Sequence, residues 1–168
     1  SYDKQHTIEC KEGFKDIDNA NYFGSNYVTV KGFTDKLMQQ YNNVLNLRIR
    51  MTMNSDKDQR NLLHKIINFN KIHNFPNSMT ILSTLFDIYI DMIKNKYTGT
   101  FNFCNKGAIT FDKILNIYNK IKNKNKKWEI INDNSRANNY LNIEMLELLY
   151  PNKILHITEA VKNIIMEY

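Results

Sequence analysis

Residues 26–51, NYVTVKGFTDKLMQQYNNVLNLRIRM, contain a helical pattern followed directly by a strand pattern. Apolar side chains recur every three or four residues over 26–41, which is typical of an amphipathic helix, and Ser25 stands where an N-cap is expected. Over 44–51 apolar residues alternate with asparagine and arginine, which predicts a strand. This succession of a helix and a strand favours an α/β fold over an all-α fold.

The rest of the chain continues the alternation of helices and strands. Helical patterns lie at 62–69, 79–94, 111–121, 143–149 and 157–166, and short strand patterns lie at 100–103 and 128–131. Thr110 can cap the helix that follows it. Residues 1–25 are polar, contain glycines and have no clear period, so they predict a long loop of the kind that is usually functional.

Composition restricts the class of protein. The chain has 168 residues, of which 42% are hydrophobic and 24% are charged, so we expect one globular unit. No apolar run reaches the roughly 18 residues that a membrane span needs, and the polar start of the chain predicts a cytoplasmic location. Cys10 and Cys104 lie far apart without metal-ligand spacing, so no metal site and no disulfide is expected.

The net charge of +6 suggests nucleic acid as a candidate partner. The basic residues are, however, spread over most of the chain. Their densest run, residues 120–127, contains asparagines but no interleaved aromatic residues, and the abundance of Asn, Lys and Ile suggests an A+T-rich genome. We therefore expect no nucleic-acid partner; the alternative would show a steep loss of affinity with salt.

Dinucleotide-binding folds carry a glycine-rich turn after their first strand, because only glycine lets the backbone approach the pyrophosphate. The five glycines of this chain are scattered, and none opens a strand-turn-helix unit. Either this chain binds no dinucleotide, or the half of the fold that carries the turn precedes Ser1.

Tyr27 and Lys31 are four residues apart in the predicted helix, so their side chains lie on one face. An ammonium beside a phenol stabilises the phenolate, which makes the tyrosine a better proton donor to a carbonyl oxygen. The same spacing also occurs by chance, as a packed tyrosine beside a solvated lysine.

Eight short blocks occur in an order and spacing typical of one enzyme family. They are GFK (13–15), GSNY (24–27), NVLNLRIRM (43–51), NSD (54–56), RNLLHK (60–65), PNSMTIL (76–82), GTFNF (99–103) and SRANN (135–139). These blocks resemble the plant UDP-rhamnose-forming 3,5-epimerase/4-reductases, which are extended short-chain dehydrogenases/reductases. The string PNSMT is specific, and the blocks span nearly the whole chain. Thr52 departs from the family pattern, which has proline at this position.

The resemblance implies the C-terminal part of a Rossmann-type NAD(P)-binding sheet plus the smaller substrate-binding lobe. It places the end of the Rossmann-type domain at 1–75 and mainly the substrate-binding lobe at 76–168. The family uses NADPH or NADH, acts on a UDP-sugar and commonly forms a homodimer through the helix at 26–41. The chain would lack the cofactor turn and the epimerase thiol, so it is expected to be inactive alone.

The resemblance also implies roles for individual residues. Tyr27 would be the general acid on the 4-keto oxygen, Lys31 would hold the nicotinamide ribose, and both residues would belong to the cofactor-binding site. Lys65 would serve the epimerase step, although a solvated lysine on an exposed helix face explains the same residue. Arg136 would bind the nucleotide-sugar phosphates, for which a guanidinium is suited. Substrate contacts are also implied for Asn77, Ser78 and Met79, although a plain turn explains the same residues.

Two other functions remain open from the sequence. One is a dTDP-4-dehydrorhamnose reductase without epimerase activity. The other is a sugar-nucleotide-binding module that keeps the fold and has no chemistry.

Overall fold

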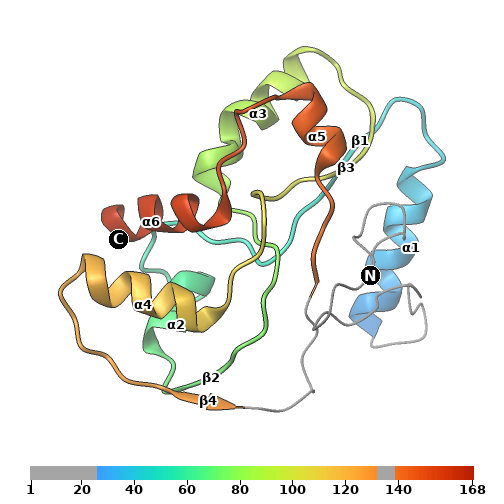
Figure 1. The fold of residues 1–168 in the computed structure, drawn as a ribbon. Helices are drawn as coiled ribbons and strands as arrows, with labels where there is room; N and C mark the ends of the chain where they lie inside the picture. The colour runs from blue at the N-terminus through green and yellow to red at the C-terminus, as the bar shows by residue number, and fades with distance from the viewer. Residues whose placement is uncertain (1–25, 132–138) are drawn as a thin grey trace.

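The computed structural model describes residues 26–131 and 139–168 (Figure 1). The predicted N-terminal loop, the predicted cap Ser25, Cys10 and Arg136 lie outside these ranges. The described part combines six helices with four short strands, which confirms the α/β prediction.

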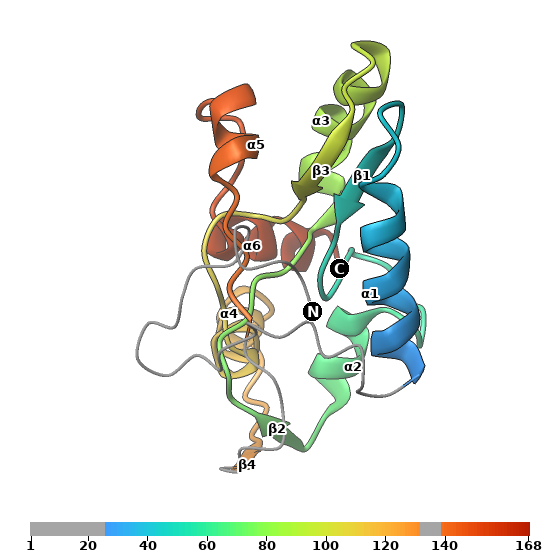
Figure 2. The ribbon, with the colours of Figure 1, turned by 90° about the vertical axis from the view of Figure 1, so that its right-hand side faces the viewer.

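One part of the molecule is built on the parallel pair of strands β1 (Leu45–Arg48) and β3 (Gly99–Asn102). Helix α3 (Leu82–Lys94) lies between them in sequence, as the crossover of a parallel pair requires. The register places Arg48, the last residue of β1, opposite Asn102. Helix α1 (Asn26–Met38) lies beside β1, and the connection after β3 leads to the other part (Figure 2).

The other part contains α2, β2, α4, β4 and α6, which lie together below the β1–β3 pair in Figure 1. Their bounds are α2 Leu62–Asn68, β2 Lys71–His73, α4 Phe111–Ile121, β4 Glu129–Ile131 and α6 Ile157–Glu167. Strands β2 and β4 form a second parallel pair. Helix α5 (Glu144–Leu149) packs near β3 instead.

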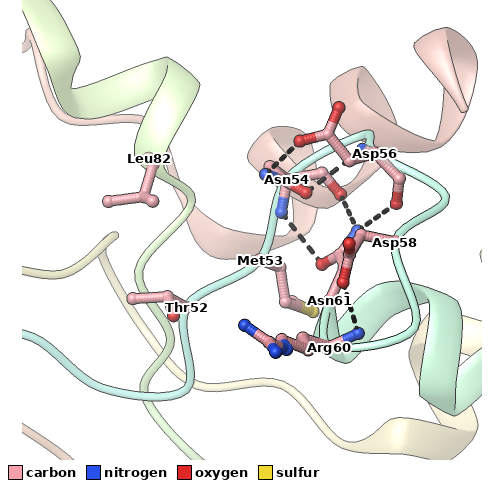
Figure 3. Close-up of a pocket in the computed structure, with 8 residues that line it drawn as sticks. All are labelled: Thr52, Met53, Asn54, Asp56, Asp58, Arg60, Asn61 and Leu82. Carbon is pink, nitrogen blue, oxygen red and sulfur yellow. Dashed lines mark hydrogen bonds between the residues drawn. The ribbon is translucent and has the colours of Figure 1, made fainter.

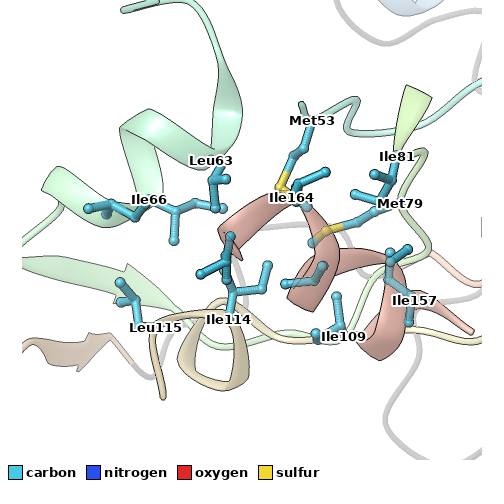
Figure 4. Close-up of a cluster of buried hydrophobic side chains, with 14 of the residues drawn as sticks. Met53, Leu63, Ile66, Met79, Ile81, Ile109, Ile114, Leu115, Ile157 and Ile164 are labelled. Carbon is cyan, nitrogen blue, oxygen red and sulfur yellow. The ribbon is translucent and has the colours of Figure 1, made fainter. Parts of the chain in front are cut away.

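Two apolar clusters form the core of the described residues. The larger joins α2, α4 and α6 through buried side chains such as Leu63, Leu115 and Ile164 (Figure 4). The smaller joins α3, β3 and α5 through residues such as Leu85 and Phe101. The larger cluster draws on residues from each side of the predicted boundary at 75/76. The buried residues of the smaller cluster all follow that boundary, and Leu45 and Leu47 pack against it from the other side. The division into 1–75 and 76–168 stays a prediction.

The predicted helices and strands are confirmed, with shorter bounds at some ends. The prediction of Thr110 as an N-cap is confirmed, because its side chain accepts a hydrogen bond from Lys113 N at 3.2 Å. Helix α3 begins at Leu82 rather than at residue 79, since Thr80 N donates to Arg50 O and Met53 N donates to Thr80 O. These bonds hold residues 79–81 extended. Strand β2 was not predicted, because it has a single buried apolar residue, Ile72.

Candidate active site

Tyr27 and Lys31 lie side by side on α1, as the sequence predicts. The Nζ atom of Lys31 is 5.9 Å from the centre of the Tyr27 ring. Tyr27 is 71% exposed, so its hydroxyl is not enclosed by packing of the described residues. The two side chains therefore share one face of α1, and their joint role in proton transfer stays a prediction.

A cavity of about 480 Å³ adjoins this pair. Helix α1 contributes Tyr27, Lys31, Thr34 and Asp35, and the other wall is residues 46–52, which form most of β1 and the segment after it. The carboxyl end of a parallel strand is where ligands bind in open α/β sheets. The predicted proton donor thus lines the same cavity as the carboxyl end of β1.

Asp35 lies one helical turn after Lys31 and is surrounded by donors. The side chain of Arg48 donates to both carboxylate oxygens, from Nε at 2.8 Å and from Nη2 at 2.6 Å. Asn46 Nδ2 donates at 2.9 Å, and Gln39 Nε2 donates at 3.0 Å. We call these four residues the Asp35 cluster. Burial raises the pKa of the Asp35 carboxyl, but the hydrogen bonds from Arg48, Asn46 and Gln39 and the charge of Arg48 outweigh it and hold the pKa below its usual 3.8.

Asn77 connects this cavity to the C-terminal part of the chain. Its Oδ1 atom accepts from Arg50 Nη2 at 2.7 Å and from the backbone N–H of Asn139 at 3.0 Å. Its Nδ2 atom donates to Phe75 O at 3.2 Å. Arg50 lines the Tyr27 cavity, so Asn77 holds a cation of the cavity wall. A direct contact of Asn77 with substrate stays a prediction.

Ser78 and Met79 are fully buried. The Oγ atom of Ser78 accepts from Leu141 N at 3.0 Å, and Met79 belongs to the larger apolar cluster (Figure 4). Ser78 therefore supports the region around residues 139–141, and Met79 supports the larger apolar cluster. Their predicted contact with substrate stays a prediction.

Lys65 lies on α2, away from the Tyr27 cavity. Leu63, Ile66 and Ile67 bury the other side of this short helix, which leaves the Lys65 side chain exposed. Lys65 is not among the residues that line the Tyr27 cavity. Its role in an epimerase step stays a prediction.

A second cavity of about 340 Å³ lies before α2 (Figure 3). Asn61 caps α2 by accepting from Leu63 N at 3.3 Å, and its Nδ2 atom donates to Asn54 O at 2.9 Å and to Asp56 O. Thr52, the departure from the family pattern, lines both cavities. The loop after β1 therefore connects the two.

Sequence reasoning did not single out Asp35, Asn46, Arg48 or Arg50. Two patterns in the sequence could have identified Asp35 and Arg48. Asp35 continues the Tyr27 and Lys31 face at the same four-residue spacing. Arg48 is a charged residue within a strand pattern, and a buried charge in a strand requires a partner.

Cys104 lies buried in the smaller apolar cluster. Burial raises the pKa of the Cys104 thiol to about 12, so this cysteine is not a reactive thiolate. Within residues 26–131 and 139–168, no three His, Cys, Asp or Glu side chains come together as a metal site. None of the helices in these ranges combines the length and apolar character that crossing a membrane requires.

Comparison with known proteins identifies relatives of the chain, although no protein-family model matches it. A protein of Acanthamoeba polyphaga mimivirus is 42% identical over 160 residues, which is 89% of this chain and 55% of that protein. The crystal structure of a UDP-rhamnose synthase from the same virus superposes with a TM-score of 0.81 at 39% identity, covering 88% of this chain and 54% of the other. The chain is homologous to a UDP-rhamnose synthase.

The chain is also similar to a trifunctional enzyme of Arabidopsis thaliana. That enzyme is a UDP-glucose 4,6-dehydratase, UDP-4-keto-6-deoxy-D-glucose 3,5-epimerase and UDP-4-keto-L-rhamnose-reductase, and it is 40% identical over 128 residues, 76% of this chain and 19% of its own length. The recognised resemblance to nucleotide-sugar epimerase/reductases is confirmed.

The fold extends to a dTDP-4-dehydrorhamnose reductase from Bacillus anthracis solved in complex with NADP. Its TM-score is 0.67 at 15% identity, over 93% of this chain and 59% of the other, and this likeness concerns the fold alone. The Rossmann-type fold prediction is thereby confirmed. The chain spans about half the length of the mimivirus protein.

Proposed function

We propose that the enzyme containing this chain epimerises UDP-4-keto-6-deoxyglucose at C3 and C5 and then reduces C4 with NADPH, and that this chain supplies the proton donor of the reduction. The observation that carries the proposal is the Tyr27 and Lys31 pair at a cavity formed with the end of β1. The chain that carries this pair is homologous to a UDP-rhamnose synthase, which supports the choice of substrate.

The side chains suit a ketone reduction. The Tyr27 hydroxyl is accessible from the cavity side and can donate its proton to the C4 oxygen. The Lys31 ammonium beside the ring can stabilise the phenolate that remains and can donate to hydroxyl groups of a ribose. NADPH, when bound, supplies the hydride. An exposed ammonium next to an exposed phenol fits such a cofactor, and the NADP complex of a reductase with the same fold supports NADPH rather than a metal as the source of chemistry.

A dTDP-4-dehydrorhamnose reductase without epimerase activity is the second candidate, favoured by the fold shared with such an enzyme. Lys65→Ala separates the two candidates. If the enzyme epimerises, this change should reduce proton exchange at C3 and C5 and leave the reduction of an already epimerised ketone intact. Loss of reduction with epimerisation intact would contradict the role proposed for Lys65.

Tyr27→Phe tests the proposal directly. It removes the hydroxyl and keeps the ring, so we expect the 4-keto reduction to fall about 10²- to 10⁴-fold, the range for loss of a positioned acid. The rate of NADPH oxidation in the presence of the keto sugar measures this fall. Tyr41→Phe is the matched control, because Tyr41 is also exposed and follows the same helix outside the cavity. Wild-type reduction by Tyr27→Phe would exclude Tyr27 as the proton donor.

Several other properties stay predictions. A UDP-sugar partner and a homodimer follow from the family, and the dimer is expected on the apolar outer face of α1, where Val30 and Phe33 are exposed. A cytoplasmic location follows from the sequence alone. Without a glycine-rich turn, the 168 residues alone are expected to show no turnover.

A further inference from the structure

Helix α1 carries the proposed proton donor but has little apolar attachment to the other residues that the structure describes. Among the residues that the structure describes, neither apolar cluster includes a residue of α1. Large side chains of the helix, such as Tyr27, Val30 and Phe33, are more than 60% exposed. Hydrophobic packing within the described residues therefore does not set the position of α1.

The Asp35 cluster attaches α1 to the β1–β3 pair through polar contacts. The side chains of Asp35 and Arg48 are 12% and 1% exposed, so water competes little for their two hydrogen bonds. A bidentate pair between a guanidinium and a carboxylate fixes orientation as well as distance. Arg48 is itself fixed at the end of β1, because its carbonyl accepts from Phe103 N at 2.8 Å.

A second connection reaches the same carboxylate from the sheet. Asn46 Nδ2 donates to Asp35 Oδ1 at 2.9 Å and lies 3.3 Å from Thr100 Oγ1 on β3. Both strands of the pair are thereby joined to one residue of α1. The next residues on the same face of α1, at four-residue steps toward its N-terminus, are Lys31 and Tyr27.

From these contacts we infer that Asp35 and Arg48 are positioning residues of the reduction: their ion pair sets the rotation and height of α1 over the end of β1, and so the place of the Tyr27 hydroxyl and the Lys31 ammonium. The inference rests on the proposed function of Tyr27. Neither residue needs to touch the substrate for this role. A displacement of about 1 Å at a reacting group can cost on the order of 10² in rate.

Arg48→Lys tests the inference in the active enzyme. Lysine keeps the positive charge but loses the planar fork, so it cannot reproduce both bonds to Asp35. We expect kcat for the 4-keto reduction to fall about 10- to 100-fold, while KM for the nucleotide sugar changes by less than about threefold. A merely structural role predicts kcat per folded molecule close to that of the wild type.

Amide hydrogen exchange on this 168-residue chain supplies a readout that does not depend on activity. The inference expects faster exchange in α1 of Arg48→Lys and unchanged exchange in α6. Faster exchange in both helices would show general destabilisation and would overturn the inference. Lys71→Met is the matched control: it removes a 2.9 Å ion pair whose side chains are more than 60% exposed, and it should change neither measurement.

The two proposals can fail separately. If Tyr27→Phe retains full reduction, the proposed function fails. If Tyr27→Phe loses reduction while folded Arg48→Lys reduces at the wild-type rate, only the positioning inference fails. Should Arg48→Lys not fold, Asp35→Glu keeps the charge and lengthens the connection by one methylene, and the same fall in kcat is expected. Wild-type kcat in folded Asp35→Glu would then overturn the inference.

Discussion

Helices α1 and α6 have similar lengths, 13 and 11 residues, but different forces hold them to the rest of the chain. Five residues of α6 are buried in the larger apolar cluster: Ile157, Ala160, Val161, Ile164 and Ile165. Helix α1 is attached within the described residues through the carboxylate of Asp35. Apolar packing is non-directional, whereas a bidentate ion pair fixes geometry. The helix that carries the proposed proton donor is thus attached by directional bonds.

The largest expected effect is on stability and comes from α6. Ile164→Ala removes a fully buried side chain from the cluster of Figure 4, and such truncations cost about 2–5 kcal/mol of unfolding free energy. Urea denaturation measures it. Met166→Ala, at a 59% exposed position of the same helix, is the control and should cost far less. Equal losses for the two variants would show that apolar burial does not hold α6.

A smaller effect, with a characteristic pH dependence, is expected from α1. Asp35→Asn removes charge-assisted hydrogen bonds, each worth about 1.5–3 kcal/mol before relaxation, so we expect a loss of about 1–3 kcal/mol at pH 7. The folded-state pKa of Asp35 lies below 3.8, so the carboxylate stabilises the fold above that pH and its contribution is lost as the pH falls through the folded-state value.

The difference in unfolding free energy between wild type and Asp35→Asn should therefore be constant near neutrality and shrink as the pH drops below 3.8. Denaturation series at neutral and acidic pH measure this difference. A difference that grows on acidification would contradict the depressed pKa. One that is absent at pH 7 would show that the carboxylate charge does not attach α1.

The same two helices show what sequence reasoning could and could not predict. The period of apolar residues predicted α6 and α1, and the four-residue spacing of Tyr27 and Lys31 predicted their contact. The partner of Asp35 was not predicted, because Arg48 follows it by thirteen residues and across a change from helix to strand. Pairing over such a distance depends on tertiary packing. The period of apolar residues and the spacing of polar residues indicate only which side chains are neighbours within one helix or strand.

The predictions for Asn77, Ser78 and Met79 show a related limit. The resemblance suggested residues near the substrate, but it contained no information on which atoms face a ligand and which face the chain. In the structure, Asn77 Oδ1 and Ser78 Oγ accept hydrogen bonds from the backbone at Asn139 and Leu141. The string at 76–80 thus led to a prediction about substrate contact that stays a prediction, because the direction of each side chain cannot be read from the sequence.

The smallest expected effect comes from an ion pair on α6, and it sharpens the contrast with Asp35. Lys162 Nζ lies 2.8 Å from Glu159 Oε1, as close as the atoms of the Asp35 pair, but the side chains are 43% and 56% exposed. Solvent and salt screen such a pair, so Lys162→Met should change the unfolding free energy by less than about 0.5 kcal/mol. Urea denaturation at low and high salt measures it. If Lys162→Met costs as much as Asp35→Asn, burial does not separate the two pairs, and the proposed directional attachment of α1 loses its physical basis.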